Sequence, residues 1–330
     1  MNNSSKTPFF IICGPTGSGK TDLSYAMAKR FPFEIVNCDV GQCYEPLTIG
    51  TAKPDWQNHA VQHNLFDCLA EPRNMSVTEY RGRLLETMSL IRSRKKIPLL
   101  VGGSLFYVRS LFFPPLDQGE IKDSEERVFL PDFLQEAPTE ELWNKLNSID
   151  SERALSIKKE DRYRLQRALE LWQATGIVPS AHKPVFQPFE PFCLTFVTRD
   201  RKELYARINQ RVRLMFEQGW VTEVAQLSEE WKQFLMQKKL VGYNDILACL
   251  QSNNVSVCAR DQKLIDTIAQ KTRNYAKRQE TFWRSFKPDL EEALRVNYGE
   301  RADLFGTVQE LNLTLSPVDV YLDHIAHQLV

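Results

Sequence analysis

The 330-residue chain lacks several features that would assign it to a particular class of protein. No apolar run approaches the ~18 residues that a membrane-spanning helix needs. The apolar run 9–13 is too short for the core of a signal peptide. The seven cysteines are odd in number and include no C-x-x-C pair, which argues against a disulfide framework and against a zinc site. We therefore expect a cytoplasmic protein that does not associate with a membrane, with Cys38 and Cys43 as reduced thiols.

Net charge is missing as well, because 42 Lys and Arg residues balance 42 Asp and Glu residues. The balance is an average over segments of opposite sign. Residues 117–150 carry −7, residues 151–213 carry +6, residues 267–284 carry +4 and residues 285–330 carry −5. Such segregation permits a polyanion-binding face, although solvated helix surfaces give the same pattern.

The clearest motif in the chain is a phosphate-binding loop. Residues 14–21, GPTGSGKT, match G-x-x-x-x-G-K-[ST] in full, between an apolar strand and a helical pattern. In this motif backbone N–H groups and the helix N-terminus surround an anion, a lysine adds charge and a hydroxyl can bind Mg²⁺. We predict that the phosphate is held by Gly14, Pro15, Thr16, Gly17, Ser18, Gly19, Lys20 and Thr21, with Thr21 on the metal.

The strand ends near this loop do not follow the pattern of an ordinary ATPase. Such an enzyme carries an Asp for Mg²⁺ at the end of a hydrophobic strand, but the strand at 98–101 runs into Gly102-Gly103-Ser104. The strand at 34–37 is the one that leads to an acid, Asp39. We expect Asp39 to face the loop from the end of a neighbouring strand, where it could bind Mg²⁺ or accept a proton.

The order of elements indicates the fold class. Strand-like runs at 9–13, 34–37 and 98–101 alternate with helical periodicity, which is typical of a parallel sheet covered by helices. Ser76 and Glu79 form a capping box for one of these helices. After Pro114 about seventy residues show only helical periodicity before a strand returns at 193–197.

We therefore predict an α/β protein in which a P-loop NTPase-like parallel sheet core is interrupted by an inserted helical domain. The core is assigned to residues 1–116 and 190–330, and the insertion to residues 117–189. A helix is expected to start at Asp200 and Glu203. The acidic segment beyond Ser285 carries no recognisable signature.

Eight further strings connect these features to a known family. They are DVGQCY (39–44), IGTAKP (49–54), HNLFD (63–67), VGGSLFY (101–107), RLQRALE (164–170), RINQR (207–211), VGY (241–243) and TRNYAKRQ (272–279). In this order and spacing the chain closely resembles the bacterial tRNA dimethylallyltransferases, from about Phe9 to Arg284.

The resemblance implies an activity and its partners. The family moves a dimethylallyl group from dimethylallyl diphosphate to the exocyclic amine of an adenosine. That adenosine lies immediately 3′ of the anticodon in tRNAs that read codons beginning with U. The phosphate loop then holds the diphosphate rather than ATP, with Mg²⁺ as cofactor. The core and the insertion together grip the anticodon stem-loop, and a monomer is expected.

The resemblance also assigns roles to single residues. Asp39 is the catalytic base that takes a proton from the amine, Ser104 orients that amine, and Arg211 belongs to the diphosphate clamp, near Arg207 on one helix face. His63 and Asp67 are interpreted as structural. The tRNA contacts implied or favoured by charge are Asp39, Val40, Gly41, Gln42, Ser104, Arg127, Tyr163, Arg164, Arg167, Lys239, Gly242, Tyr243, Arg273, Lys277, Arg278 and Arg284.

Three other functions remain open at this point. A small-molecule kinase would share the phosphate loop and bind ATP. An isopentenyltransferase acting on free adenine nucleotide would share the chemistry but have little use for the basic segments. An RNA-binding protein without catalysis would not need Lys20, Thr21, Asp39 and Arg211 together. Burial is the more common reason for Tyr243 and Trp283, although either ring could stack on a base.

Overall fold

The computed structural model describes residues 7–58, 60–114, 130–182 and 185–329. Arg127 lies outside the described residues. The chain divides into two compact units, one of residues 1–112 and 187–330 and the other of residues 113–186. The first unit contains a six-stranded sheet, and the described part of the second unit is helical.

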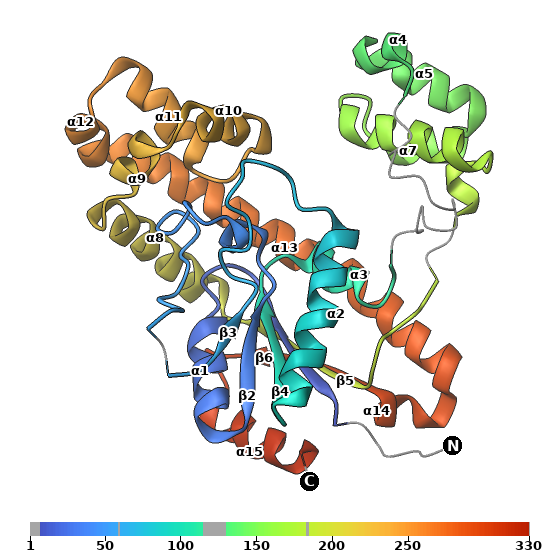
Figure 1. Cartoon of the computed structure of the whole chain (residues 1–330), viewed down its shortest axis with the longest axis vertical. Coiled ribbons are helices and arrows are strands. Elements are labelled where there is room, and N and C mark those ends of the chain that lie inside the picture. The colour runs from blue at the N-terminus through green and yellow to red at the C-terminus, as the bar shows by residue number, and fades with distance from the viewer. Residues whose placement is uncertain (1–6, 59, 115–129, 183–184, 330) are drawn as a thin grey trace. The chain divides into compact units, whose positions relative to one another are not determined.

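All strands of the sheet are parallel, in the order β3-β2-β4-β1-β5-β6. Helices surround the strands in Figure 1, and the fold is that of a P-loop NTPase-like α/β protein, so the predicted fold class is confirmed. The strands are β1 (Phe9–Cys13), β2 (Phe33–Asn37), β3 (His63–Asn64), β4 (Ile97–Gly102), β5 (Phe192–Thr198) and β6 (Gly306–Asn312).

Fully buried strands explain the apolar runs in the sequence. Every residue of β1 and β2 is buried, as expected for central strands covered by helices on both faces. Phe10, Ile12 and Leu99 from the sheet pack with Leu23 and Met27 of helix α1 in the main core. The helices of the first half are α1 (Lys20–Arg30), α2 (Val77–Ser93) and α3 (Leu105–Ser110), with a 3₁₀ turn η1 (Val40–Cys43).

The start of α2 shows how the local sequence sets a helix boundary. The Ser76 side chain accepts a hydrogen bond of 3.0 Å from the N–H of Glu79, which confirms the first half of the predicted capping box. The Glu79 carboxylate does not return to the Ser76 N–H among the described contacts but pairs with Arg73 and Arg83. Helix α2 is therefore capped on one side only.

The segment after β5 is mainly helical and includes a helix of 37 residues, ~55 Å long at 1.5 Å per residue. In Figure 1 this helix, α13, runs from the group α8–α12 past the sheet towards α14. The elements are α8 (Arg201–Glu217), α9 (Trp220–Gln226), α10 (Glu229–Lys238), α11 (Tyr243–Ser252), α12 (Val255–Arg260), α13 (Gln262–Tyr298), the 3₁₀ turn η4 (Gly299–Arg301), α14 (Ala302–Phe305) and α15 (Val318–Gln328).

The acidic C-terminal segment, for which the sequence indicated no structure, completes the sheet. Strand β6 pairs with β5 along seven residues. Trp283 of α13 stacks on Phe196 of β5, with ring centroids 4.5 Å apart, and donates to Glu310 of β6 at 3.0 Å. Trp283 is therefore a core residue that holds α13 to the sheet, and its ring is not free to stack on a base.

The second unit has its own small core. Leu142 and Leu146 of the helix at 139–149 pack with Leu165 and Leu169 of the helix at 162–175. The unit carries Arg164 on an exposed face of the longest helix. Its elements are α4 (Asp132–Glu136), α5 (Thr139–Ile149), α6 (Ser151–Ser156), α7 (Arg162–Thr175) and the 3₁₀ turn η3 (Pro179–Ala181).

Candidate active site

The predicted phosphate loop lies between β1 and α1, as its motif requires. Gly14, Gly17 and Gly19 have φ angles of +149°, +82° and +98°. At Gly14 the loop also presses against β5, because a Cβ there would lie 2.1 Å from the carbonyl oxygen of Val197. Only glycine allows this approach and this backbone conformation together.

Lys20 folds over the inside of the loop. Its Nζ donates to the carbonyl oxygens of Gly14 at 2.9 Å and Pro15 at 2.8 Å. Burial lowers the pKa of Lys20 to about 8, and the nearby Asp39 acts against this. A bound anion would raise that pKa again, so anion binding and protonation of Lys20 favour each other.

Three arginines brace the same loop from β5 and α8. Arg199 Nε donates to the Ser18 carbonyl at 2.9 Å, and Arg207 Nε donates to the Gly17 carbonyl at 3.0 Å. Arg211 lies 3.5 Å from the Thr16 hydroxyl. The two arginines four residues apart on α8 thus both reach the loop. Arg199 had no motif to point to it, since its role depends on β5 lying next to β1.

A pocket of ~380 Å³ opens beside the loop. It combines the start of α1 with one face of α8, and its charged groups are Lys20, Arg207, Arg211 and a single carboxylate, Asp22. Such a cationic lining suits a polyphosphate group. The lining residues are Gly17, Gly19, Lys20, Thr21, Asp22, Ala52, Arg207, Gln210, Arg211 and Leu214.

Asp39 reaches the loop in a different way from the one expected. Strand β2 is not next to β1, because β4 lies between them. The carboxyl end of β4 carries Gly102 and Gly103, which have no side chains to separate Asp39 from the loop. A Cβ on Gly103 would lie 3.4 Å from Asp39 Oδ2 and 3.5 Å from the Gly14 carbonyl oxygen. The acid and the loop therefore meet across a glycine strand end.

The surroundings of Asp39 adjust its basicity. Burial raises the pKa of its carboxyl, and Lys20, the N–H of Gly41 and Arg211 act against this without reversing it. The Gly41 N–H donates to Asp39 Oδ1 at 3.2 Å. A carboxylate whose pKa is raised is a better proton acceptor than a solvated one.

Ser104 lies beside the Asp39 turn, which is the 3₁₀ turn η1 (Val40–Cys43) with Asp39 at its N-cap. Its Oγ accepts a hydrogen bond of 3.1 Å from the N–H of Val40, so its own proton is free to be donated to another acceptor. Gln42 of the same turn donates to the carbonyls of Thr51 and Ala52, at 3.2 Å each. The turn thus carries one acid, one nearby hydroxyl and a link to the following loop.

Gln279 of α13 is a site residue to which the sequence assigned no role. Its Oε1 accepts from the Thr16 N–H at 3.0 Å, and its Nε2 donates to the Gly103 carbonyl at 2.8 Å. The side chain is 5% exposed. Gln279 therefore ties the phosphate loop to the strand end beneath Asp39. Its place within the string TRNYAKRQ was the only available signal.

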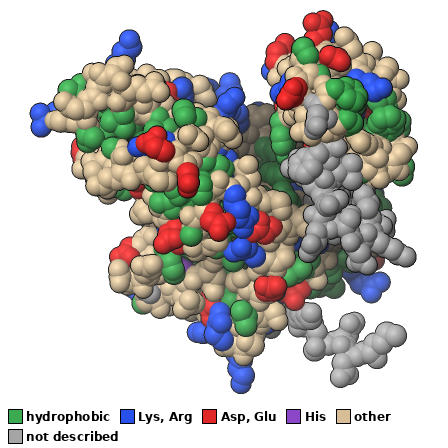
Figure 2. Space-filling view, turned by 45° about the horizontal axis from the view of Figure 1, so that its top comes forward, with side chains coloured by type: hydrophobic (Ala, Val, Ile, Leu, Met, Phe, Trp, Pro, Cys, Tyr) green, Lys and Arg blue, Asp and Glu red, His purple; other side chains and the backbone are tan. Residues whose placement is uncertain are grey.

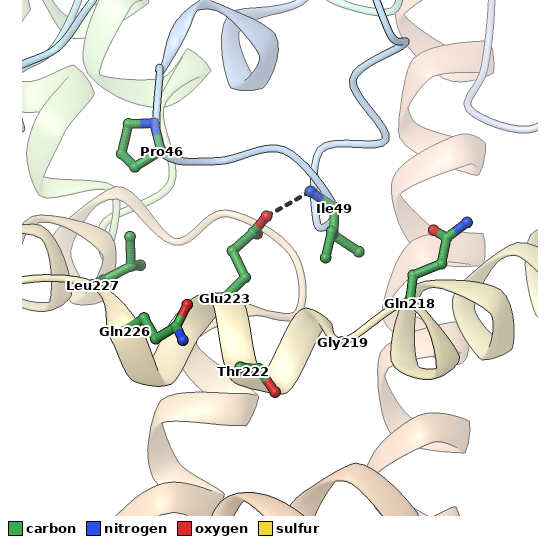
Figure 3. Close-up of a pocket in the computed structure, with 8 residues that line it drawn as sticks. All are labelled: Pro46, Ile49, Gln218, Gly219, Thr222, Glu223, Gln226 and Leu227. Atoms are coloured by element: carbon green, nitrogen blue, oxygen red, sulfur yellow. Dashed lines mark hydrogen bonds between the residues drawn. The ribbon is translucent and has the colours of Figure 1, made fainter.

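A second pocket, of ~500 Å³, lies against the loop that follows the Asp39 turn (Figure 3). Glu223 of α9 points from its wall to that loop and accepts from the N–H groups of Thr48 at 2.9 Å, Ile49 at 2.6 Å and Gly50 at 3.3 Å. The Tyr243 hydroxyl donates to the same carboxylate at 3.0 Å. These bonds already occupy Glu223, so its function here is to hold the loop.

Tyr243 and Gly242 differ from their predicted place in an RNA contact. Tyr243 is 1% exposed and packs edge-on against Trp220, which also lies over Gly242. The side chain presents no surface on which a base could stack. Both residues shape the support for the loop at 48–50, whereas Lys239 of the same region is exposed.

The other predicted RNA contacts differ in the partners that their charges already have. Lys277, Arg278 and Arg284 of α13 are exposed. Arg278 lies over the ring of Tyr275, and Arg284 Nε donates to the Glu280 carbonyl at 3.4 Å. Arg273 donates instead to Asn209 and Gln270 and lies over the ring of Tyr205. In the second unit Tyr163 is exposed, and the partners of Arg164 and Arg167 are Asp161 at 3.4 Å and Glu170 at 3.0 Å.

Positive side chains do not form one continuous patch on the face that Figure 2 shows. Figure 2 shows Lys and Arg interspersed with Asp and Glu over the visible surface. Some of the charged residues counted in the sequence segments neutralise each other in local ion pairs such as Arg164–Asp161. On this face a polyanion would be held by individual exposed cations.

His63 and Asp67 have structural surroundings, in agreement with their interpretation. His63 is buried and its Nδ1 lies 2.7 Å from the Val61 carbonyl oxygen. Asp67 accepts from Lys53 and, at 2.9 Å, from Trp56 Nε1. Cys38 and Cys43 are free thiols, as predicted. The expectation that an odd cysteine count excludes disulfides was too broad, because Cys249 and Cys258 form one between α11 and α12.

Two absences in the described part of the chain complete the description of the site. Among residues 7–58, 60–114, 130–182 and 185–329, none of the helices is long and apolar enough to cross a membrane. Within the same ranges, His, Cys, Asp and Glu side chains nowhere gather in threes as a metal site.

Comparison with known proteins gives a consistent result. The family model described as IPP transferase matches residues 42–286. The tRNA dimethylallyltransferase 2 of Geotalea uraniireducens is 34% identical over 313 residues, which is 93% of this chain and 97% of that protein.

Two solved structures show the same fold. A tRNA Δ2-isopentenylpyrophosphate transferase from Staphylococcus epidermidis has a TM-score of 0.56 at 26% identity and covers 98% of each chain. A eukaryotic dimethylallyltransferase that acts on tRNA has a TM-score of 0.74 at 22% identity, and the match covers 98% of this chain and 80% of that one. The latter supports the fold alone.

The bridging role of Gln279 can be tested with inorganic diphosphate. Gln279→Met keeps the length of the side chain but loses both hydrogen bonds, so the loop is less well held. We expect the dissociation constant measured by calorimetry to rise about tenfold, the equivalent of ~1.4 kcal/mol. Gln262→Met, an exposed position at the start of the same helix, is the matched control and should bind as the parent does. Equal affinity in all three proteins would contradict the assignment.

Proposed function

Because the chain belongs to the IPP transferase family, we propose that it transfers a dimethylallyl group from dimethylallyl diphosphate to tRNA. The acceptor is N6 of the adenosine immediately 3′ of the anticodon, in tRNAs that read codons beginning with U. One observation carries the proposal: the Asp39 carboxylate interacts electrostatically with Lys20 and Arg211, two of the cations that line the pocket. A proton acceptor and a diphosphate site are thus side by side.

The phosphate loop provides the binding site for the leaving group. Diphosphate leaves readily when its developing charge is stabilised by fixed donors. Lys20, Arg211 and the backbone N–H groups of the loop are such donors, and Arg207 adds charge at the pocket wall. Gln279 and Arg199 hold the loop in place for this purpose.

Mg²⁺ is part of the proposal, and the residues present fit it. Thr21 is exposed at the first turn of α1 and lines the pocket, so its hydroxyl is available to a cation. Mg²⁺ in phosphate sites is held by few protein ligands, with substrate oxygens and water as the rest. The bound ion would supply charge neutralisation for the diphosphate. Thr21 is the residue that would hold it.

Asp39 and Ser104 act on the acceptor. The exocyclic amine of adenine is a weak nucleophile because its lone pair is delocalised into the ring, so its proton must be removed as the new C–N bond forms. Asp39, with its raised pKa, accepts that proton. Ser104, whose Oγ accepts a hydrogen bond from the Val40 N–H, directs its hydroxyl proton towards the acceptor adenine. Apolar contacts are needed to shield the allylic chain from water.

The tRNA must present its adenosine unstacked, because the amine cannot reach Asp39 from within a stacked loop. Exposed cations on α13 suit the sugar–phosphate backbone, which positions a nucleic acid without reading its sequence. The helical second unit, with Arg164 and Arg167, is proposed as the other half of the grip. A monomer in the cytoplasm is consistent with this function.

Two other functions remain as possible outcomes of the test, a small-molecule kinase and a transferase that acts on free adenine nucleotide. A small-molecule kinase would need an acidic Mg²⁺ ligand at the end of β4, where the chain has Gly102 and Gly103. Transfer to free adenine nucleotide would leave Lys277, Arg278 and Arg284 without a role. These residues favour a tRNA acceptor.

The deciding assay supplies dimethylallyl diphosphate, Mg²⁺ and an unmodified tRNA with adenosine 3′ of an anticodon ending in A. Parallel reactions contain AMP, or ATP without RNA. Mass spectrometry of the digested tRNA should find the dimethylallyl group on that adenosine alone. An adduct on AMP would indicate a nucleotide-modifying enzyme, and ATP consumption without an adduct would indicate a kinase.

Removing the base should affect turnover and its pH dependence. Asp39→Asn keeps the shape of the side chain but cannot accept a proton, so we expect kcat to fall about 10³-fold. In the parent, kcat should decrease as the pH falls through the raised pKa of Asp39, and this acidic limb should vanish in the variant. Filter-binding affinity for tRNA should stay within about twofold. A variant that loses tRNA binding but keeps kcat would disprove the assignment.

Removing an exposed cation of α13 and removing one that is bonded within the protein should affect different properties, namely tRNA binding and stability. Lys277→Ala removes one free charge, so the slope of log Kd for tRNA against log salt should decrease by about one. Arg273→Ala removes an internal contact to Asn209 and should lower the thermal midpoint of unfolding instead. Lys29→Ala, at an exposed position in the last turn of α1, is the control. Equal salt slopes for all proteins would place Lys277 outside the tRNA contact.

A further inference from the structure

Two cysteines that the proposed chemistry does not use lie next to each other beside the Asp39 turn. Cys43 ends the 3₁₀ turn η1, and Cys68 follows β3. The backbone pairs them: Tyr44 and Leu69 form a parallel bridge, and the Leu69 N–H donates to the Cys43 carbonyl at 2.9 Å. One residue earlier in this register, Cys43 stands opposite Cys68.

The two thiols also converge. Cys43 Sγ lies 3.9 Å from the Leu65 carbonyl oxygen, and Cys68 Sγ lies 3.7 Å from the same atom. Paired strands are ~4.8 Å apart, and disulfides join Cα atoms ~4.4–6.8 Å apart. The spacing of two paired segments thus falls within the range that a disulfide spans.

The two cysteines differ in accessibility and acidity. Cys43 is 1% exposed, whereas Cys68 is half-buried. A hydrogen bond from the Cys43 thiol lowers the pKa of Cys68, and Arg83, which donates to the Cys68 carbonyl at 3.1 Å, acts in the same direction. Cys68 is thus the thiol that reacts first with a reagent from solvent, and Cys43 is the resolving thiol that can then attack the oxidised Cys68.

We propose that Cys68 and Cys43 form an oxidation site for hydroperoxides, which converts the pair into a disulfide that slows the enzyme. The Cys68 thiolate attacks one peroxide oxygen, the S–O bond forms, the O–O bond breaks, and the leaving alkoxide or hydroxide takes up a proton. Cys43 then attacks the sulfur of the Cys68 sulfenic acid. The S–S bond forms, the S–O bond breaks, and the oxygen leaves as water with the Cys43 proton.

The disulfide would act on catalysis through the Asp39 turn. Cys43 Sγ lies 3.7 Å from the Asp39 carbonyl oxygen, and Asn37 Nδ2 contacts both that oxygen, at 3.1 Å, and Cys43 Sγ, at 3.4 Å. Drawing Cys43 towards Cys68 removes the thiol from these contacts and shifts the turn that carries the base. A displacement of ~1 Å at a reacting group can cost up to ~100-fold in rate.

The experiment treats the full-length protein with hydrogen peroxide, blocks remaining thiols, digests without reduction and identifies linked peptides by mass spectrometry. We expect a Cys43–Cys68 link to appear with peroxide and to disappear with dithiothreitol. The proposal would be overturned if Cys43 and Cys68 both still carried the blocking group after peroxide treatment. It would also be overturned if Cys68 were oxidised beyond the sulfenic acid and no link formed. This readout does not depend on the proposed function.

Two variants separate the pair from other effects. Cys68→Ser should keep full prenyl transfer after peroxide, while the parent loses about tenfold and recovers with dithiothreitol. Cys43→Ser should accumulate a sulfenic acid on Cys68 that dimedone traps. Equal inactivation of the parent and Cys68→Ser would overturn the effect on catalysis. The Cys249–Cys258 disulfide gives a different linked peptide and serves as an internal reference.

Discussion

The close backbone approach at the carboxyl end of β4 is the constraint on which the candidate site depends. A Cβ on Gly102 would lie 1.9 Å from the Cys38 carbonyl oxygen, and one on Gly103 would collide with Gln279. Without these glycines the acid from β2 could not lie beside the loop from β1, since β4 separates the two strands. The same two residues remove the acidic ligand that an ATP-hydrolysing protein would place there. The two glycines thus allow Asp39 to approach the phosphate loop and also leave the site without the acidic metal ligand of an ATPase.

Helix α13 adds the connection between this site and the rest of the first unit. Through Gln279 it reaches the phosphate loop and β4, and through Trp283 it reaches β5 and β6. Its exposed residues include Lys277 and Arg278, which directly precede Gln279 in the sequence. The helix that carries the proposed tRNA contacts Lys277 and Arg278 therefore also holds the phosphate loop through Gln279.

Local patterns predicted much of this from the sequence, because they depend on neighbouring residues. The phosphate loop, the buried strands and the Ser76 cap are of this kind. Gln279, Arg199 and Glu223 could not be found, since each acts on residues more than 170 positions away in the chain. The RNA contact predicted for Tyr243 shows the same limit, because an aromatic ring in this sequence pattern looks the same whether it faces a base or packs against Trp220 and donates to Glu223.

Strand β6 was missed for another reason, and its position has a consequence for how the chain is made. Its mixed polar composition suits an edge strand, which gives only a weak apolar signal. Its partner β5 ends at Thr198, and β6 begins only at Gly306. A ribosome adding ~5–20 residues per second needs several seconds for that interval. During this time one side of β5 lacks its hydrogen-bonding partner, so the sheet is complete only after the C-terminal segment has been synthesised.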